Sequence, residues 1–202
     1  MDVSRLSAWQ IYEAGGPMMW PLVIVSIFSV AIIAERLWFL KKLNFDTAKF
    51  LAQLLDKIKH RQIKEAVQLC DTARNPVTNI LKSAIVKYDR PRSQIKEAME
   101  DAALYELPKL HKNLPALATL AHVAPLLGFL GTALGLLRVF GAIQMRSSQM
   151  MPVTTADIAG GVLEALLTTV TGLMIAIPVY IMYNYLVSRV NTFILVMEQA
   201  AT

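Results

Sequence analysis

Three long runs without a charged side chain constrain this chain more than any other feature of its sequence. No Asp, Glu, Lys or Arg occurs in residues 14–34, 113–137 or 165–188, which are 21, 25 and 24 residues long. A helix needs roughly 20 apolar residues to cross the hydrocarbon core of a bilayer. Because 55% of the chain is hydrophobic and only 17% is charged, it is a poor fit for a soluble domain. We predict an all-α polytopic membrane protein with three transmembrane helices.

The placement of positive charge predicts how the chain crosses the membrane. Residues 41–113 carry 15 Lys or Arg, whereas residues 1–19 and 141–157 carry one each. Loops rich in Lys and Arg stay on the cytoplasmic side, so we expect the N-terminus to lie outside. The predicted segments are an external N-terminal segment (1–16), transmembrane helix 1 (17–40), a cytoplasmic helical region (41–113), transmembrane helix 2 (114–143), an external loop (144–157), transmembrane helix 3 extending into the cytoplasm (158–188) and a cytoplasmic C-terminus (189–202).

Several other classes of protein find little support in the sequence. The single cysteine, Cys70, cannot form an intrachain disulfide, and the three histidines have no metal-ligand spacing. We recognise no motif with a catalytic nucleophile and base, and the glycines from Gly128 to Gly135 lack the Lys and Ser/Thr of a phosphate-binding loop. We therefore expect no enzyme, metal or cofactor. Membrane topology and anionic membrane lipids explain the net charge of +5 without nucleic-acid binding.

The cytoplasmic region has the periodicity of several amphipathic helices. Apolar residues recur at helical spacing from Phe50 to Ile58 and again from Ile63 to Cys70. Asn75 followed by Pro76 predicts the start of a third short helix. A longer helix is expected after Pro91, and the sequence leaves open whether it continues into the second span. These helices suit packing on one another and on neighbouring subunits.

Glu164 is the candidate functional carboxylate, because it lies within the predicted third membrane helix. Ionisable groups inside a membrane are costly, so they usually face a protein interior or a wet cavity and mark an ion path. The alternative is a shallow position, in which Glu164 only forms an ion pair with Arg138 near the outer end of the second span. On a helical wheel Glu164 shares a face with Thr168 and Thr171, and Thr169 is turned about 140° away.

A second candidate site combines one threonine from each of the last two spans. Thr132 and Thr169 lie at similar distances from the outer ends of their helices, so antiparallel neighbours would bring the two hydroxyls to one depth. A threonine in a membrane helix often only bonds the preceding carbonyl, which is the alternative for each of them. Close helix contacts are predicted at small residues four apart. These residues are Gly128, Gly131, Thr132, Gly135, Gly161 and Ala165.

The residues from Pro125 to Gly135 and from Glu164 to Pro178, with Tyr183 and Asn184, resemble the MotA/TolQ/ExbB proton-channel family, closest to its ExbB/TolQ branch. The Gly-Gly-Pro-Met-Met-Trp-Pro and Glu-Arg-Leu-Trp segments at the two ends of the first span are similar to the same branch. The resemblance implies a homopentameric ring around the single transmembrane helices of ExbD/TolR-like partners, which bring a protonatable aspartate. It also implies that Thr132 and Thr169 face the pore, that Glu164 lies close by in the subunit interface, and that the chain lies in a bacterial inner membrane with its N-terminus in the periplasm. We also expect Gly172 to be a packing position and Pro178 to be a helix kink.

Together these features predict a ring subunit of an inner-membrane motor that couples proton entry to motion of a partner. Such a motor would energise outer-membrane transport through a TonB-like protein. A TolQ-like role in envelope integrity is the alternative within the family. The alternative from another class is a passive membrane scaffold, in which the glycine and threonine positions serve packing alone.

Overall fold

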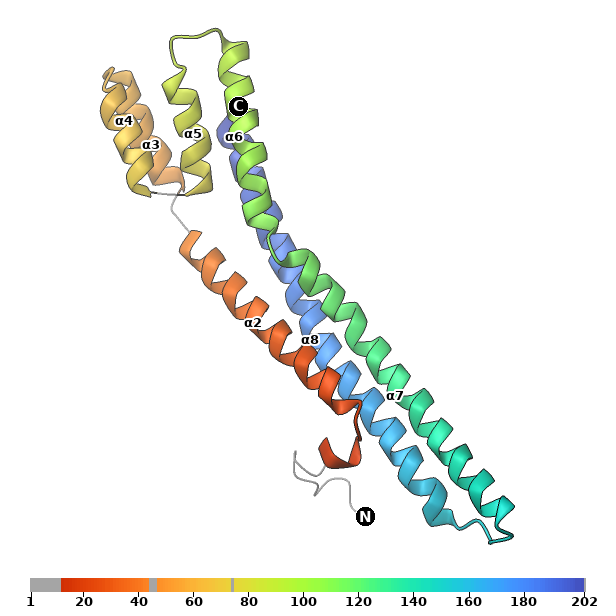
Figure 1. Cartoon of the computed structure of the whole chain (residues 1–202). Helices are drawn as coiled ribbons and strands as arrows, with labels where there is room; N and C mark the ends of the chain where they lie inside the picture. The colour runs from red at the N-terminus through yellow and green to blue at the C-terminus, as the bar shows by residue number, and fades with distance from the viewer. Residues whose placement is uncertain (1–11, 44–46, 74, 202) are drawn as a thin grey trace. The chain divides into compact units, whose positions relative to one another are not determined.

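The computed structural model describes residues 12–43, 47–73 and 75–201, and every regular element in these ranges is a helix (Figure 1). Most of the predicted N-terminal segment 1–16 therefore lies outside the described residues. The helices, in chain order, are α2 (Met19–Leu43), α3 (Thr47–Lys59), α4 (Ile63–Ala73), α5 (Pro76–Val86), α6 (Arg92–His111), α7 (Leu114–Ser148) and α8 (Thr155–Ala201). The predicted all-α fold is confirmed.

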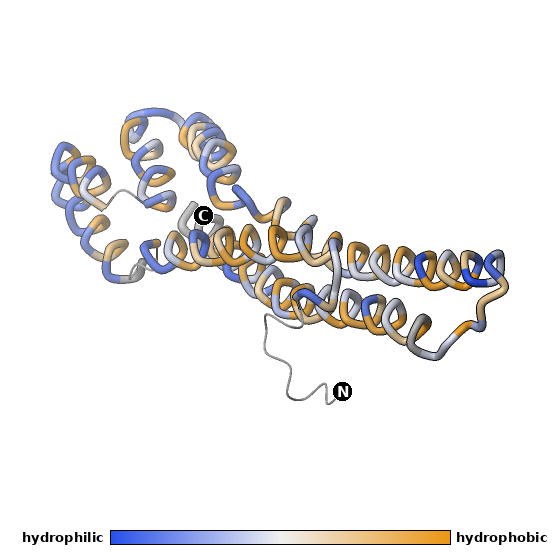
Figure 2. Tube along the Cα trace, turned by 60° about the horizontal axis from the view of Figure 1, so that its bottom comes forward, coloured by the Kyte–Doolittle hydropathy of each residue, from blue (hydrophilic) through white to orange (hydrophobic). Residues whose placement is uncertain are grey.

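Within the described part of the chain, three stretches are long and apolar enough to cross a membrane. They lie in Met19–Leu43, in Arg92–Ser148 and in Ile158–Leu195, with mean hydropathies of 2.0, 1.9 and 2.0. Figure 2 shows hydrophobic residues along these long helices and hydrophilic residues on the short ones. Only 22%, 22% and 28% of the three apolar windows is buried inside the chain. Most of each span's surface is therefore left for lipid or for other protein chains.

The chain divides into two compact units, the first of which is formed by Met1–Ala34 and Pro115–Asn184. It contains most of the apolar part of α2, with α7 and the first part of α8. Its core brings together Val25 of α2, Ala124 of α7 and Ala176 of α8. Two of these three residues are alanines, and their small side chains allow the membrane helices to approach closely.

The second unit is formed by Glu35–Leu114 and Tyr185–Thr202, and within it α3, α4, α5 and α6 pack on one another in sequence order. The predicted helix start at Asn75 is confirmed, because the Val77 amide donates to Asn75 Oδ1 at 3.2 Å and the Asn75 amide donates to Thr78 Oγ1 at 3.1 Å. This reciprocal cap satisfies two amides that the helix itself leaves free.

The structure also answers whether the long helix continues into the second span. Helix α6 ends at His111 and α7 begins at Leu114. Asn113 between them has φ 61°, a left-handed conformation that Asn tolerates better than most residues. Glu35 Oε2 accepts a 2.6 Å hydrogen bond from Asn113 Nδ2, and buried Arg36 donates to the Lys109 carbonyl at 3.3 Å. The two helices are therefore separate, and two side chains of α2 form hydrogen bonds with the residues around the break.

Candidate functional site

The site is built on a close contact between α7 and α8 inside the first unit. Five glycines lie along this contact, and a Cβ atom added at any of them would meet the opposite helix. At Gly135 it would lie 2.8 Å from Ala165 Cβ, and at Gly172 it would lie 2.8 Å from the Ala124 carbonyl oxygen. The contacts therefore leave no room for a side chain. The five are Gly128, Gly131, Gly135, Gly161 and Gly172.

Thr132 and Thr169 meet across this contact, where their hydroxyl oxygens are hydrogen-bonded to each other. Thr169 Oγ1 also lies 3.1 Å from the Gly128 carbonyl oxygen of the opposite helix, and Thr132 Oγ1 lies 3.4 Å from that of Ala165. Each hydroxyl has one proton, so one threonine donates to the other while the second donates to a carbonyl. Both side chains are partly exposed. The pair is thus a polar group in an apolar surface. It lies next to Gly128 and Gly131, where α7 and α8 are in close contact.

Glu164 and Arg138 form an ion pair between the same two helices. The Glu164 side chain is 18% exposed, whereas that of Arg138 is 50% exposed. The carboxylate also packs against Gly16, whose φ of +68° suits glycine and where a Cβ would strike the Glu164 carboxyl group. Gly16 was not among the predicted site residues, because only the fold brings the segment before α2 to this carboxylate.

The neighbouring threonines of α8 are satisfied within their own helix. Thr168 is fully buried against Gly131 and donates to the Ala165 carbonyl at 2.8 Å. Thr171 donates to the carbonyl of Leu167 at 2.8 Å. Thr168 and Thr171 therefore differ from the threonine pair, because each bonds only to a carbonyl of its own helix, as threonines in membrane helices often do. Pro178 lies within α8, which continues through it.

The fold and the site together define a polytopic helical membrane protein with polar and charged side chains between its apolar helices. The model of the MotA/TolQ/ExbB proton channel family matches residues 54–199. The chain belongs to this family and is a proton-channel subunit of its ExbB/TolQ group.

Some of the similar proteins are named ExbB and others are named TolQ. The chain is 26% identical over 183 residues to a biopolymer transport protein ExbB homolog of Methanothermobacter thermautotrophicus, a match that covers 90% of this chain and 63% of that protein. It is 30% identical over 187 residues to the biopolymer transport protein ExbB-like 3 of Synechocystis, covering 92% and 88%. The Tol-Pal system protein TolQ of Haemophilus influenzae is 38% identical over 109 residues, which are 52% of this chain and 46% of TolQ.

Proposed function

We propose that this protein is the ring subunit of a motor in the bacterial inner membrane that is driven by the proton-motive force. The motor would energise outer-membrane transport through a TonB-like protein. The observation that carries the proposal is the hydrogen-bonded pair of Thr132 and Thr169, which is polar, partly exposed and set in an apolar surface. A packing contact alone would not require two hydroxyls at one depth.

The threonine pair needs a partner to move protons. Threonine hydroxyls donate and accept hydrogen bonds, but they do not ionise near neutral pH. The titrating group would therefore come from another chain, and an ExbD/TolR-like single-span protein with a transmembrane aspartate fits that requirement. Because most of the apolar surface is not buried within the chain, a homopentameric ring around such partner helices can cover part of it.

The test of this function is proton movement through the purified complex. The chain is co-expressed with the single-span protein and reconstituted into liposomes that contain a pH-sensitive dye, and an imposed membrane potential drives the flux. We expect proton entry that is lost when the partner's transmembrane aspartate is changed to Asn. A complex that assembles and conducts no protons would instead favour the passive scaffold.

A TolQ-like role in the Tol-Pal envelope system is the second candidate, favoured by the 38% identity with the Haemophilus TolQ over 109 residues. The two roles differ in the third component of the motor. Co-purification with a TonB-like protein would support the transport role, whereas co-purification with a TolA-like protein would support the envelope role.

The proposed orientation places residues 41–113 in the cytoplasm and residues 144–157 outside. Cys70 is a poor reporter of sidedness, because it is 1% exposed and its burial, followed by the charge of Asp71, raises the pKa of its thiol. Exposed Ser148 and Ser93 are better positions for introduced cysteines in a Cys70→Ala background. In spheroplasts we expect an impermeant thiol reagent to label Ser148→Cys and to spare Ser93→Cys until the membrane is opened. The reverse pattern would invert the topology.

Glu164→Gln tests what the ion pair with Arg138 does. We propose that the charge of Glu164 shapes the proton path, so uptake should fall by about tenfold or more while the complex is still recovered. The matched control is Glu100→Gln, which removes a carboxylate from an exposed ion pair with Lys96 on α6 and should keep full uptake. If the Glu164→Gln variant kept normal uptake but its complex were less stable, the role of Glu164 would be purely structural.

A further inference from the structure

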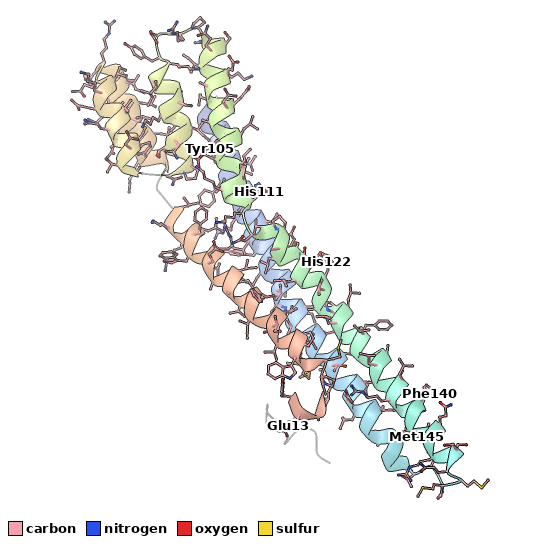
Figure 3. All side chains as sticks on the ribbon, viewed as in Figure 1. Glu13, Tyr105, His111, His122, Phe140 and Met145 are labelled. Carbon is pink, nitrogen blue, oxygen red and sulfur yellow. The ribbon has the colours of Figure 1, made fainter. Side chains whose placement is uncertain are left out.

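His122 is the feature of the membrane helices that the site described above does not use. It lies on α7, where Figure 3 labels it, and it is the one titratable side chain in residues 114–137. It precedes Thr132 by about 15 Å of helix, on the side toward Leu114. Its side chain is exposed in the single chain. Because a polar ring facing hydrocarbon is costly, an exposed histidine here favours a lumen or a protein partner over lipid.

The hydrogen bonds of His122 define which nitrogen can take a proton. Its Nδ1 lies 2.7 Å from the Ala118 carbonyl oxygen. A carbonyl oxygen only accepts, so Nδ1 carries the hydrogen and the neutral ring keeps its lone pair on Nε2. Among the described residues, Nε2 has no hydrogen-bond partner, and no carboxylate forms an ion pair with this ring. The free nitrogen is thus a proton acceptor at the helix surface.

One tyrosine of α8 packs against the imidazole, and a second tyrosine lies beside the first. The ring of Tyr180 packs edge to face against that of His122, with 6.2 Å between centroids and 83° between planes. Tyr183 continues the row, its centroid 6.4 Å from that of Tyr180. Tyr180 follows Thr169 by about 16 Å of helix, which matches the spacing from His122 to Thr132. His122 of α7 and Tyr180 of α8 therefore form a second pair of polar side chains between these helices, about 15 Å along the helices from the threonine pair.

We propose that His122 is a second protonation site on the proton path, supplied by this chain itself. The proposal rests on the proton-driven function proposed above. Nε2 accepts a proton from a hydronium ion on the side of the threonine pair, which leaves a water molecule, and the ring becomes an imidazolium while Nδ1–H stays bonded to the Ala118 carbonyl. Nε2 then releases that proton to water on the side toward Leu114, so the ring returns to its starting form and one proton has crossed. Imidazole suits this step because each of its two ring nitrogens can carry a proton.

The experiment compares proton flux through liposomes that contain the complex with its single-span partner. We expect His122→Gln, which keeps hydrogen bonding but cannot cycle a proton, to lower the flux by about tenfold or more. The matched control is His111→Gln, since exposed His111 makes the same type of bond, from Nδ1 to the Leu107 carbonyl at 3.1 Å, outside the apolar runs. The control should conduct as the wild type does.

A second variant separates proton transfer from structure. His122→Ala should lose flux and regain part of it when imidazole is added to the buffer, because the free base can occupy the space left by the ring. If His122→Gln fails to assemble, this rescue decides the question. Full flux in His122→Gln, or no rescue of an assembled His122→Ala complex, would overturn the proposal. Thr132→Val is measured in parallel: its loss of flux beside a fully active His122→Gln would reject the relay and keep the proposed function.

Discussion

Thr132→Val and Thr169→Val are each expected to abolish energy-dependent uptake and to leave the complex intact. Valine keeps nearly the shape and volume of threonine and removes the hydroxyl. An interhelical hydrogen bond in a membrane protein contributes only about 0.6 kcal/mol on average, so the loss of one bond should not disassemble the protein. A proton path that uses the pair loses a polar group that no neighbouring side chain replaces, because Thr168 is fully buried and bonded within α8.

The matched control for this pair is Thr119→Val on the same helix. Exposed Thr119 donates to the Pro115 carbonyl at 3.0 Å and has no partner on another helix among the described residues. Uptake is measured in cells that carry each variant as their only copy, and recovery of the complex is the assembly control. We expect Thr119→Val to keep normal uptake. Equal uptake by Thr132→Val, Thr169→Val and Thr119→Val would contradict a role for the pair and favour the scaffold.

The helices could be predicted from the sequence because their signals are local. The length of the apolar runs predicts the spans, and the Asn75–Pro76 pair predicts a cap that the structure confirms. The boundary between α6 and α7 is different. Two prolines lie near it, yet Pro108 is inside α6 and Pro115 is in the first turn of α7. The break is at Asn113, whose conformation is supported by Glu35 from a distant part of the sequence.

In the site, too, contacts between residues far apart in the sequence could not be predicted from local patterns. Counting residues along antiparallel helices predicts that Thr132 and Thr169 share a depth, and the structure brings their hydroxyls together. A helical wheel gives the direction of Thr168 but not its neighbour, so it could not show that Gly131 covers this side chain. The contact of Glu164 with Gly16 likewise depends on how a segment far away in the sequence returns to α8.

The glycines of α7 differ in what surrounds them, which makes their substitutions a graded test of helix packing. A Cβ added at Gly135 would lie 2.8 Å from Ala165 Cβ and 2.9 Å from the Gly161 carbonyl oxygen. Backbone cannot move aside as a flexible side chain does, so overpacking here should cost at least about 1–3 kcal/mol. At Gly131 the added Cβ would lie 2.6 Å from Thr168 Cβ, which is fixed to the backbone of α8 in a fully buried residue. At Gly141, on the same helix, nothing lies within 4 Å.

We therefore expect Gly135→Leu and Gly131→Leu each to eliminate the assembled complex, and Gly135→Ala to lower its recovery and thermal stability. Gly141→Leu is the matched control, since the same side chain enters the same helix where the chain itself leaves open space. Recovery is measured by size-exclusion chromatography of the detergent-solubilised complex, with total expression as the reference. If close packing of α7 on α8 positions the threonine pair, uptake should fall in the order of these clashes. An intact, active complex with Leu at Gly135 would refute the packing role of this contact, because two backbones this close cannot hold that side chain between them.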